Sequence, residues 1–541
     1  MTMDLFRQPD HPQTHLLLPG MPTPNGRLHL GHISGPFLKM DVIARSLRRA
    51  GHTAGVVSCS DSPESYVTLR SFQTGEHPEV VAHEFHKGIR SDLEQLDLDM
   101  LYLDPLGSDH KEAFEAEMRS FQEAVLRSGK VIRRKEKFAV APEEKYYGTG
   151  CWISGRCPVC QSGSGSYVCE NCGTHYRAMD LGNPTYNFDH EPGQLREIEL
   201  ETLWLKISDV PGLLGYLENI QFPPGMEEIA PTYLAHQGPY IRLTNPDRWG
   251  FPWPVPGSAA PQVASSYTHT LGLGVFCGKI WAAQRGLRLH PMHRESDAIV
   301  SASFGIDNAV PYFVGHSGVA RETDYCRPYN HLIGNYFAYL QGEKFSTSRR
   351  HAIWASEVSQ LTPLHSDAVR YFLVKVNPEY RSSNFLVDAL IATVREDLVD
   401  GLQNRILAYL PALDRSVPAA LPDRLAQALG NLIVQQQMHL DPGKLALTRS
   451  LAPLREWWED AEAVPPTQHY WWLKGLALLA APILPFTAQW LWATLGGRGV
   501  PTLAAFPEPT PPQDHFELPN WFQPVSYSDL SPCLPTHLTL H

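Results

Sequence analysis

The chain has 541 residues with a formal net charge of −12 at neutral pH, and 43% of its residues are hydrophobic. This length exceeds one ordinary domain, so we expect several domains with separate cores. The acidic balance gives no support for a globally basic surface that binds nucleic acid, although local basic patches stay compatible with RNA. No segment approaches the roughly 20 apolar residues that span a bilayer, and no signal-peptide pattern opens the chain. These features predict a cytoplasmic protein without a membrane partner.

The first patterned stretch joins a short apolar strand to a helix. Residues 15–18 end in three leucines and predict a buried strand, and residues 19–26 form a loop rich in Pro, Gly and Asn. Apolar residues then recur with a helical period up to Gly51. His29 and His32 therefore stand where the carboxyl end of a strand turns into a helix, a place that suits nucleotide phosphates. Their imidazole N–H groups can face one phosphate, or the two residues only cap the helix.

The following segments continue an α/β pattern. Residues 54–60 predict a second parallel strand, and most of residues 67–135 have helical patterns with charged, solvated faces. The composition then changes to Gly, Cys, Tyr and Ser, which indicates an insertion, and residues 298–307 return to the pattern of the core fold. Beyond Pro363 the chain is helical, and a Pro-rich tail follows that we expect to lie on the surface without a fold of its own.

Four of the nine cysteines form two Cys-x-x-Cys turns within the predicted insertion, namely Cys157, Cys160, Cys169 and Cys172. Paired turns of this kind place four thiolates around one tetrahedral Zn²⁺. Because four sulfur ligands leave no open position, the zinc is expected to be structural. Free thiols that cluster by chance are the alternative. Such a site suits a reducing compartment better than a disulfide framework does.

Two short motifs resemble the signatures of class I aminoacyl-tRNA synthetases. Residues 24–32, Pro-Asn-Gly-Arg-Leu-His-Leu-Gly-His, resemble the HIGH motif, and residues 344–349, Lys-Phe-Ser-Thr-Ser-Arg, resemble the KMSKS loop. The continuation through residues 41–45 and 51–52, with the cysteine insertion between the two motifs, resembles the methionyl branch. The resemblance implies an α/β fold with a Rossmann-type parallel sheet, a zinc-knuckle connective insertion and a C-terminal α-helical bundle.

This fold divides the chain into five expected parts. Residues 1–135 and 191–362 form the two halves of the catalytic domain, and residues 136–190 form the zinc-knuckle insertion. Residues 363–496 form a bundle like the family's anticodon-binding domain, and residues 497–541 form the tail.

The resemblance also implies a first reaction, in which an amino-acid carboxylate attacks the α-phosphate of ATP and expels pyrophosphate. Charge develops on phosphate oxygens, so catalysis needs fixed donors, cations and Mg²⁺. The implied catalytic residues are His29, His32 and Lys344. The implied ATP-binding residues are Gly31, Gly305, Asp307, Ser346, Thr347 and Ser348. Asp307 matches the family's ribose-binding carboxylate, or else it caps a helix. Thr347 replaces the motif's second lysine and removes one phosphate-facing cation.

The amino-acid site is assigned to Met21, Thr23, Asp61 and Tyr312. Asp61 matches the family's partner for the substrate ammonium, and the alternative is a solvated loop carboxylate. Thr23 and Tyr312 stand where methionine enzymes have Tyr and His. These changes alter the size and polarity of the pocket and argue against methionine specificity.

The C-terminal half resembles the anticodon-binding bundle less closely. Asn404 is followed by Ala408 where the family has an Asn-x-x-x-Arg word, and Trp457 or Trp458 either stacks on an anticodon base or belongs to the core.

Three functions follow. The favoured one is a ligase with ATP, Mg²⁺ and Zn²⁺ as cofactors that passes an activated amino acid to a small amine or hydroxylamine in a biosynthetic pathway. Any N–N bond-forming cupin would then be a separate protein. The alternatives are a genuine methionyl-tRNA synthetase that charges tRNA(Met), and a catalytically silent paralogue that binds tRNA or a nucleotide.

Overall fold

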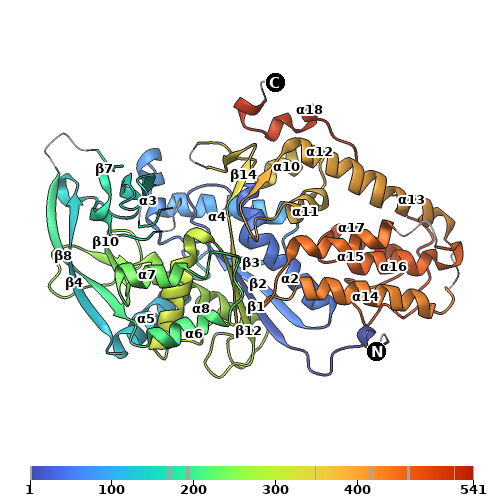
Figure 1. The fold of residues 1–541 in the computed structure, drawn as a ribbon, viewed down its shortest axis with the longest axis horizontal. Helices are drawn as coiled ribbons and strands as arrows, with labels where there is room; N and C mark the ends of the chain where they lie inside the picture. The colour runs from blue at the N-terminus through green and yellow to red at the C-terminus, as the bar shows by residue number, and fades with distance from the viewer. Residues whose placement is uncertain are drawn as a thin grey trace.

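The computed structural model describes residues 3–165, 167–169, 174–189, 195–347, 349–413, 416, 418–459, 464–516, 518 and 520–539. Two predicted site residues, Cys172 and Ser348, lie outside the described residues. Figure 1 shows the central sheet in the middle of the molecule, the predicted insertion on one side and the C-terminal helices on the other.

A five-stranded parallel sheet forms the centre of the molecule, as the sequence predicts. Its order is β13 (His331–Asn335), β12 (Ile299–Gly305), β1 (Thr14–Pro19), β2 (Thr53–Cys59) and β3 (Leu101–Leu103). In register, His15 pairs with Ile299 and Leu17 pairs with Val56. The chain leaves β1 toward β2 on one side and returns to β12 on the other. A crevice therefore opens at the carboxyl ends of β1 and β12, where open α/β sheets bind ligands.

Helices cover both faces of this sheet. Alternate residues of a strand point to opposite faces. Leu17 accordingly packs with Met40 and Ile43, whereas Leu16 packs with the buried side chains around Phe276. The first face is covered by α1 (Leu30–His32), the π-helical turn η2 (Ile33–Phe37) and α2 (Leu38–Arg49), and the second by α8 (Ser266–Gln284). The helices after β2 are α3 (Ser65–Thr74), α4 (Pro78–Gln95) and α5 (Lys111–Arg127).

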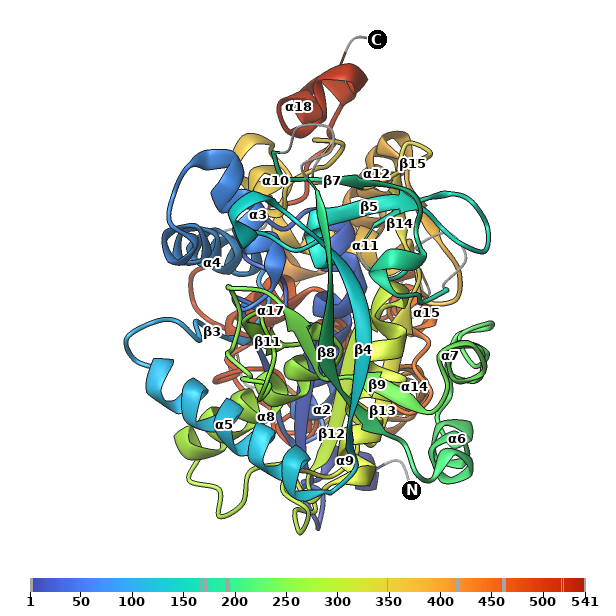
Figure 2. The same ribbon diagram turned by 90° about the vertical axis from the view of Figure 1, so that its left-hand side faces the viewer.

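The region between β3 and α8 contains a three-stranded sheet that the sequence did not predict, in the order β4 (Val131–Val140), β8 (Arg196–Lys206) and β9 (Tyr240–Arg242). β4 pairs antiparallel with β8, and both face the viewer in Figure 2. Alternating charges on β4 meet glutamates on β8, as in the pairs Arg133–Glu201 and Lys137–Glu197. In the sequence, the charged residues of β4 look like the solvated face of a helix. In the structure they form the exposed face of a strand. The expected boundary at residue 135 falls inside β4.

The remaining elements of this region are small. They are β5 (Ile153–Arg156), β6 (Gly163–Gly165), β7 (Gly182–Tyr186), α6 (Val210–Glu218), α7 (Ile229–Gln237), β10 (Thr244–Pro246) and β11 (Gln262–Ala264).

Helices dominate the chain after β12. They are α9 (Ser317–Glu322), α10 (Ala355–Leu361), α11 (Ser366–Lys375), α12 (Val387–Thr393), η8 (Val394–Gln403), α13 (Asn404–Tyr409), α14 (Asp423–His439), α15 (Leu451–Glu459), α16 (His469–Ala480), α17 (Pro485–Thr494) and α18 (Tyr527–Leu530). A small sheet joins β14 (Ala338–Leu340), β15 (Glu343–Lys344) and β16 (Ser383–Phe385). Short 3-10 or π turns are η1 (Met3–Phe6), η3 (Pro142–Glu144), η4 (Gly150–Trp152), η5 (Ala178–Asp180), η6 (Ile306–Asn308), η7 (Pro311–His316), η9 (Leu410–Ala412), η10 (Leu447–Ser450), η12 (Pro466–Gln468), η13 (Ser531–Cys533) and η14 (Thr536–Leu538).

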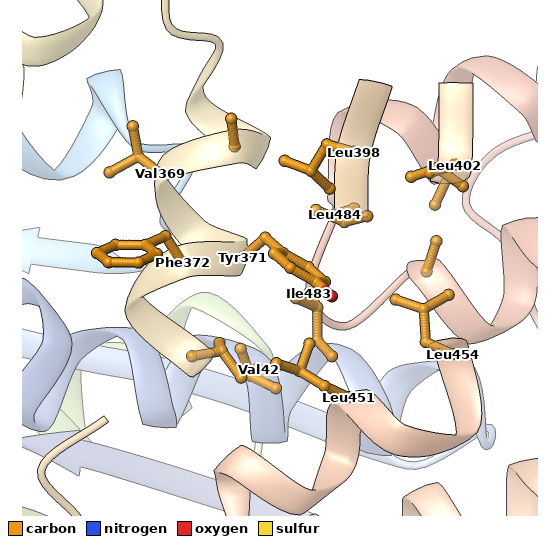
Figure 3. Packing of buried hydrophobic residues seen from close by; sticks show 14 of the residues in the cluster. Val42, Val369, Tyr371, Phe372, Leu398, Leu402, Leu451, Leu454, Ile483 and Leu484 are labelled. Atoms are coloured by element: carbon orange, nitrogen blue, oxygen red, sulfur yellow. The ribbon is translucent and has the colours of Figure 1, made fainter. Parts of the chain in front are cut away.

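A continuous apolar core joins the helical region to the sheet. Figure 3 shows Val42 of α2, Phe372 of α11 and Ile483 of the loop before α17 as members of one cluster of buried side chains. Within this core the guanidinium of Arg370 is fully buried and donates to Asp41 Oδ2 at 2.6 Å and to the Ile483 carbonyl at 3.0 Å. The first helix of the nucleotide fold is thus fixed to the C-terminal helices by a charged contact as well as by apolar packing.

Buried side chains fix the Pro-rich tail to the rest of the molecule. Leu503, Phe506 and Phe522 are buried in the same core, and the last part of the tail contains α18, η13 and η14. Gln403 also exchanges two hydrogen bonds with the backbone of Phe522. The Pro-rich composition of the tail does not indicate that several of its apolar side chains are buried. Among the helices that the structure describes, none combines the length and apolar composition needed to cross a bilayer.

Candidate active site

A large cleft opens at the carboxyl ends of β1 and β12, with a volume of about 1260 Å³. It is lined by all the predicted catalytic, ATP-binding and amino-acid-binding residues that the structure describes: Met21, Thr23, His29, Gly31, His32, Asp61, Gly305, Asp307, Tyr312, Lys344, Ser346 and Thr347. Residues from four separate stretches of the chain therefore line one cleft.

The two histidines cap the start of the helix and also face the cleft. The backbone N–H of His32 donates to His29 Nδ1 at 3.2 Å, and the N–H of His29 donates to His32 Nδ1 at 3.3 Å. The rings stack with centroids 3.6 Å apart and planes 10° apart. Since both Nδ1 atoms accept hydrogen bonds, each neutral ring carries its hydrogen on Nε2. The cap thus leaves two Nε2–H donors for a ligand, so capping and phosphate binding are compatible.

Both rings are uncharged near neutral pH. Burial is the main cause that holds the pKa of His29 well below its ordinary value, and the neighbouring His32 adds to it. His32 is exposed within the cleft, but the surrounding walls limit its hydration, and this effect together with the charge of Lys344 lowers its pKa to about 4. The pair therefore offers neutral donors.

The segment from Lys344 to His351, here called the Lys344 loop, rests on the start of this helix. Phe345 stacks on His29 with ring centroids 5.1 Å apart. The chain just beyond the loop pairs with the helix start, because Leu30 N donates to the Ile353 carbonyl at 2.9 Å. A Cβ on Gly31 would lie 3.0 Å from the Phe345 ring, so the glycine permits this close packing. Lys344 Nζ lies 3.7 Å from the centroid of the Phe337 ring.

Asp307 lies in the turn after β12, on the side of the cleft formed by the second half of the sheet. A Cβ on Gly305 would lie 2.5 Å from Asp307 Oδ1, so a larger residue at 305 would displace this carboxylate from its present position. Asn335, at the carboxyl end of β13, also lines the cleft and was missed by the sequence analysis. Its Oδ1 accepts from Lys39 Nζ at 3.2 Å, and burial lowers the pKa of that lysine. Nothing in the sequence around Lys39 indicates its contact with Asn335.

Asp61 is buried and does not lie alone in the site. Its Oδ1 is 2.7 Å from His269 Nε2, and its backbone N–H donates to the Pro22 carbonyl at 2.9 Å. His269 lies on α8, about two hundred residues along the chain, and was also missed. Burial lowers the pKa of His269, but the charge of Asp61 and their hydrogen bond outweigh this effect and raise it. In the sequence, His269 could have been noticed only as a single histidine within an apolar helix.

The wall next to Asp61 combines aromatic and polar side chains. Tyr312 stacks on Phe304 with centroids 4.2 Å apart, and burial raises its pKa. His316 Nε2 lies 2.8 Å from Thr270 Oγ1, and burial lowers the pKa of His316 to about 3. Met21 and Thr23 line the same cleft. The pocket therefore offers flat aromatic surfaces together with hydrogen-bonding groups.

The described cysteines of the predicted metal site lie together beside β5 and β6. The Sγ atoms of Cys157, Cys160 and Cys169 all lie within 4.8 Å of one another, and Cys160 and Cys169 are 3.6 Å apart. Tetrahedral zinc with Zn–S bonds of about 2.3 Å would place its sulfurs roughly 3.8 Å apart. The three thiols therefore fit zinc, and Cys172 as fourth ligand lies outside the described residues.

The proposed anticodon contacts look different in the structure. Trp457 and Trp458 are both buried in the bundle, and Trp457 Nε1 donates to the Trp472 carbonyl at 3.0 Å. Both indoles belong to the core, which leaves neither face open for a base. Asn404 and Ala408 are exposed on α13.

Comparison with known proteins agrees with this arrangement. A family model described as tRNA synthetases class I (M) matches residues 15–264 and 304–408. Methionine–tRNA ligase of Pyrobaculum islandicum is 26% identical over 519 residues, with 89% of each chain covered. That of Salinispora tropica is 24% identical over 534 residues, covering 88% of this chain and 87% of the relative. Mycobacterium tuberculosis methionyl-tRNA synthetase, solved with methionyl-adenylate, superposes with a TM-score of 0.69 at 16% identity and covers 95% of this chain and 100% of that one.

These matches define the class. The chain belongs to the class I tRNA synthetases of the methionyl type, and it has their α/β fold with a helical C-terminal region. It is accordingly an ATP-dependent, amino-acid-activating ligase.

Proposed function

We propose that this enzyme joins methionine to AMP in the cleft and transfers the methionyl group to tRNA. One observation carries the proposal: residues from the HIGH-like stretch, the turn after β12 and the Lys344 loop line a single cleft at the switch point of the sheet. The amino acid and the acceptor are proposed because the relatives are methionine–tRNA ligases.

The geometry suggests a role for each group. Asp61 receives the ammonium of the amino acid, whose carboxylate then points along the cleft toward the α-phosphate of ATP. A bond forms between a carboxylate oxygen and the α-phosphorus, and the bond to the pyrophosphate oxygen breaks. The Nε2–H groups of His29 and His32 donate to phosphate oxygens as their charge grows, and Lys344 stabilises the departing pyrophosphate.

The neutral state of the histidines matters for this chemistry. Fixed uncharged donors stabilise developing negative charge without giving up a proton, so adenylate formation needs no titration of His29 or His32 near neutral pH. Asp307 is placed to accept hydrogen bonds from the ribose hydroxyls, since it lies in the turn at the edge of the cleft.

Two metals complete the proposal. Zn²⁺ would be held by Cys157, Cys160, Cys169 and Cys172, and it would hold the knuckle together without taking part in chemistry. Mg²⁺ bound to the ATP phosphates would supply further positive charge.

The test is the formation of methionyl-tRNA from total tRNA, methionine and ATP, with a K344M variant as the inactive control. The proposal predicts acid-precipitable, alkali-labile methionyl-tRNA with the wild-type enzyme, and much slower formation of it with K344M. If methionine supports adenylate formation but no tRNA is charged, the transfer step proposed here is wrong.

A small amine or hydroxylamine is the second candidate acceptor. The burial of Trp457 and Trp458 favours it, because it removes the expected stacking surface for an anticodon base. Addition of hydroxylamine to the adenylate-forming reaction would give an amino-acid hydroxamate. Enzyme-dependent hydroxamate formation that is faster than tRNA charging, and that saturates with hydroxylamine, would favour this candidate over tRNA.

A further inference from the structure

The contact between Asp61 and His269 is not required by the proposed chemistry. Asp61 is 5% exposed and His269 is 2% exposed, and their side chains meet at 2.7 Å, with Asp61 lining the cleft. A carboxylate that receives an ammonium group needs no internal partner of this kind. The contact between Asp61 and His269 therefore indicates a further role for His269.

The hydrogen bonds of His269 indicate its protonation state. Nε2 faces Asp61 Oδ1, and Nδ1 lies 3.3 Å from the carbonyl oxygen of Ala264. A carboxylate and a carbonyl oxygen only accept hydrogen bonds, so both bonds form together only when each ring nitrogen carries a hydrogen. His269 then is an imidazolium, and it forms a buried ion pair with Asp61.

The other groups around the pair do not replace this cation. Burial and Asp61 raise the pKa of Glu64, whose Oε1 accepts from the backbone N–H and the hydroxyl of Ser65 at 2.8 Å each. Burial raises the pKa of Tyr312 and of Cys59, so both stay uncharged. His316 has a pKa of about 3 and is neutral. Within the described pocket, His269 is the positive charge that faces Asp61.

We propose that the amino group of the substrate and the proton on His269 compete for the Asp61 carboxylate, so that amino-acid binding is coupled to loss of this proton. The proposal rests on the proposed function, because it takes an amino acid as the substrate. An ammonium group placed at Asp61 lies beside the imidazolium, and two like charges in a buried site repel each other. Deprotonation of His269 removes this repulsion and frees the carboxylate. His269 is therefore a positioning residue that sets the strength of amino-group recognition.

The competition has a defined sign. At low pH His269 is charged and the amino acid binds weakly, whereas at high pH the neutral ring leaves Asp61 to the ammonium. The KM for the amino acid therefore falls as the pH rises, by at most roughly tenfold per pH unit for one coupled proton. The kcat for adenylate formation depends less on pH, because His269 does not face the phosphates.

The test measures amino-acid-dependent ATP–pyrophosphate exchange from about pH 6 to about pH 8.5, the range in which histidine titrates. The H269Q variant keeps an amide donor toward Asp61 but takes up no proton, so its KM is expected to stay flat across this range. H290Q is the matched control: His290 follows α8 but does not line the cleft, and this variant should keep the wild-type slope. Parallel KM profiles for the wild type and H269Q would overturn the proposal.

A second measurement needs no substrate. Urea unfolding of the wild type, D61N, H269Q and the double variant reports the coupling between the two residues. Because the pKa of His269 is raised in the folded protein, the coupling is present at low pH and is lost as the pH rises through that pKa. Additive midpoint shifts at both low and high pH would overturn the ion pair and the competition. Absence of exchange with every amino acid would instead overturn the proposed function, and the competition with it.

Discussion

At the scale of single residues, the site depends on groups whose charge is fixed by their neighbours. The hydrogen bonds of the His29 and His32 cap fix the tautomer of both rings, and burial keeps them neutral. Lys344 is then the positive side chain among the proposed catalytic residues. Its loop is held against the histidines by Phe345, so a cation and two neutral donors share one part of the cleft.

The K344M variant tests this arrangement. We expect the rate of adenylate formation to fall by roughly 10² to 10³, since one charge that stabilises the transition state is lost. The KM for the amino acid should change little, because Asp61 and Tyr312 are untouched. Single-turnover formation of adenylate is the measurement. R350M serves as control, because Arg350 is exposed on the same loop and does not line the cleft. Equal losses in both variants would indicate a general disturbance of the loop.

At the scale of elements, the helix α2 connects the active site with the C-terminal helices. The buried pair of Asp41 and Arg370 crosses this junction, and the guanidinium also donates to the carbonyls of Leu96 and Ile483. Removal of one member leaves buried polar groups without a partner.

The R370A variant is accordingly expected to lose roughly 3 to 5 kcal/mol of stability. Arg45 still reaches Asp41 at 2.9 Å, which favours the lower end of this range. Urea unfolding followed by tryptophan fluorescence measures the change. R395A, a change of an exposed arginine on η8, is the control and should shift the midpoint little. An R370A midpoint equal to the wild type would contradict the proposed role of the contact.

The strand β1 contains a buried histidine, His15, whose protonation is expected to affect stability. His15 is 4% exposed, neither ring nitrogen has a hydrogen-bond partner among the described residues, and burial with the neighbouring His52 lowers its pKa to about 4. The folded state therefore binds this proton less readily than the unfolded state does. Stability is expected to fall as the pH drops from about 6.5 toward 4, by up to about 3 kcal/mol from this residue. H15L should remove that part of the acid sensitivity in urea unfolding at pH 7 and at pH 4.5. An unchanged difference between the two pH values would contradict the assignment.

The cysteine knuckle is an element that a metal would hold together. We expect about one zinc per chain by elemental analysis, and loss of that zinc in C160S. C151S is the matched control, since Cys151 is buried outside the cluster. Zinc content that is the same in C160S and in the wild type would contradict a site at these cysteines.

At the scale of the whole molecule, the sequence predicts the parallel sheet and the position of the cleft because these depend on local patterns. Residues 15–18 and 54–60 are apolar strands followed by polar turns, and such strands place their ends at one edge of a sheet. The pairing of β4 with β8 was not predictable in this way, since its partners are far apart in sequence and its charged face resembles a helix surface.

In the site, too, some residues can be predicted from local sequence patterns and others cannot. The histidines and Lys344 belong to motifs with a fixed spacing, and Asp61 matches an aspartate of the family that these motifs resemble, so all four can be proposed from the sequence. Asn335 reaches the cleft, and His269 reaches the cleft residue Asp61, only through the packing of β13 and α8, and no local pattern marks either residue. The buried Trp457 and Trp458 show the reverse case, in which a residue type suggests binding but the fold assigns it to the core.

Activation of an amino acid with ATP in this cleft is tested by amino-acid-dependent ATP–pyrophosphate exchange, measured for each of the common amino acids in the absence of tRNA. We expect exchange with methionine that is strongly reduced in K344M. Exchange with no amino acid, under conditions in which the folded enzyme still binds ATP, would contradict it.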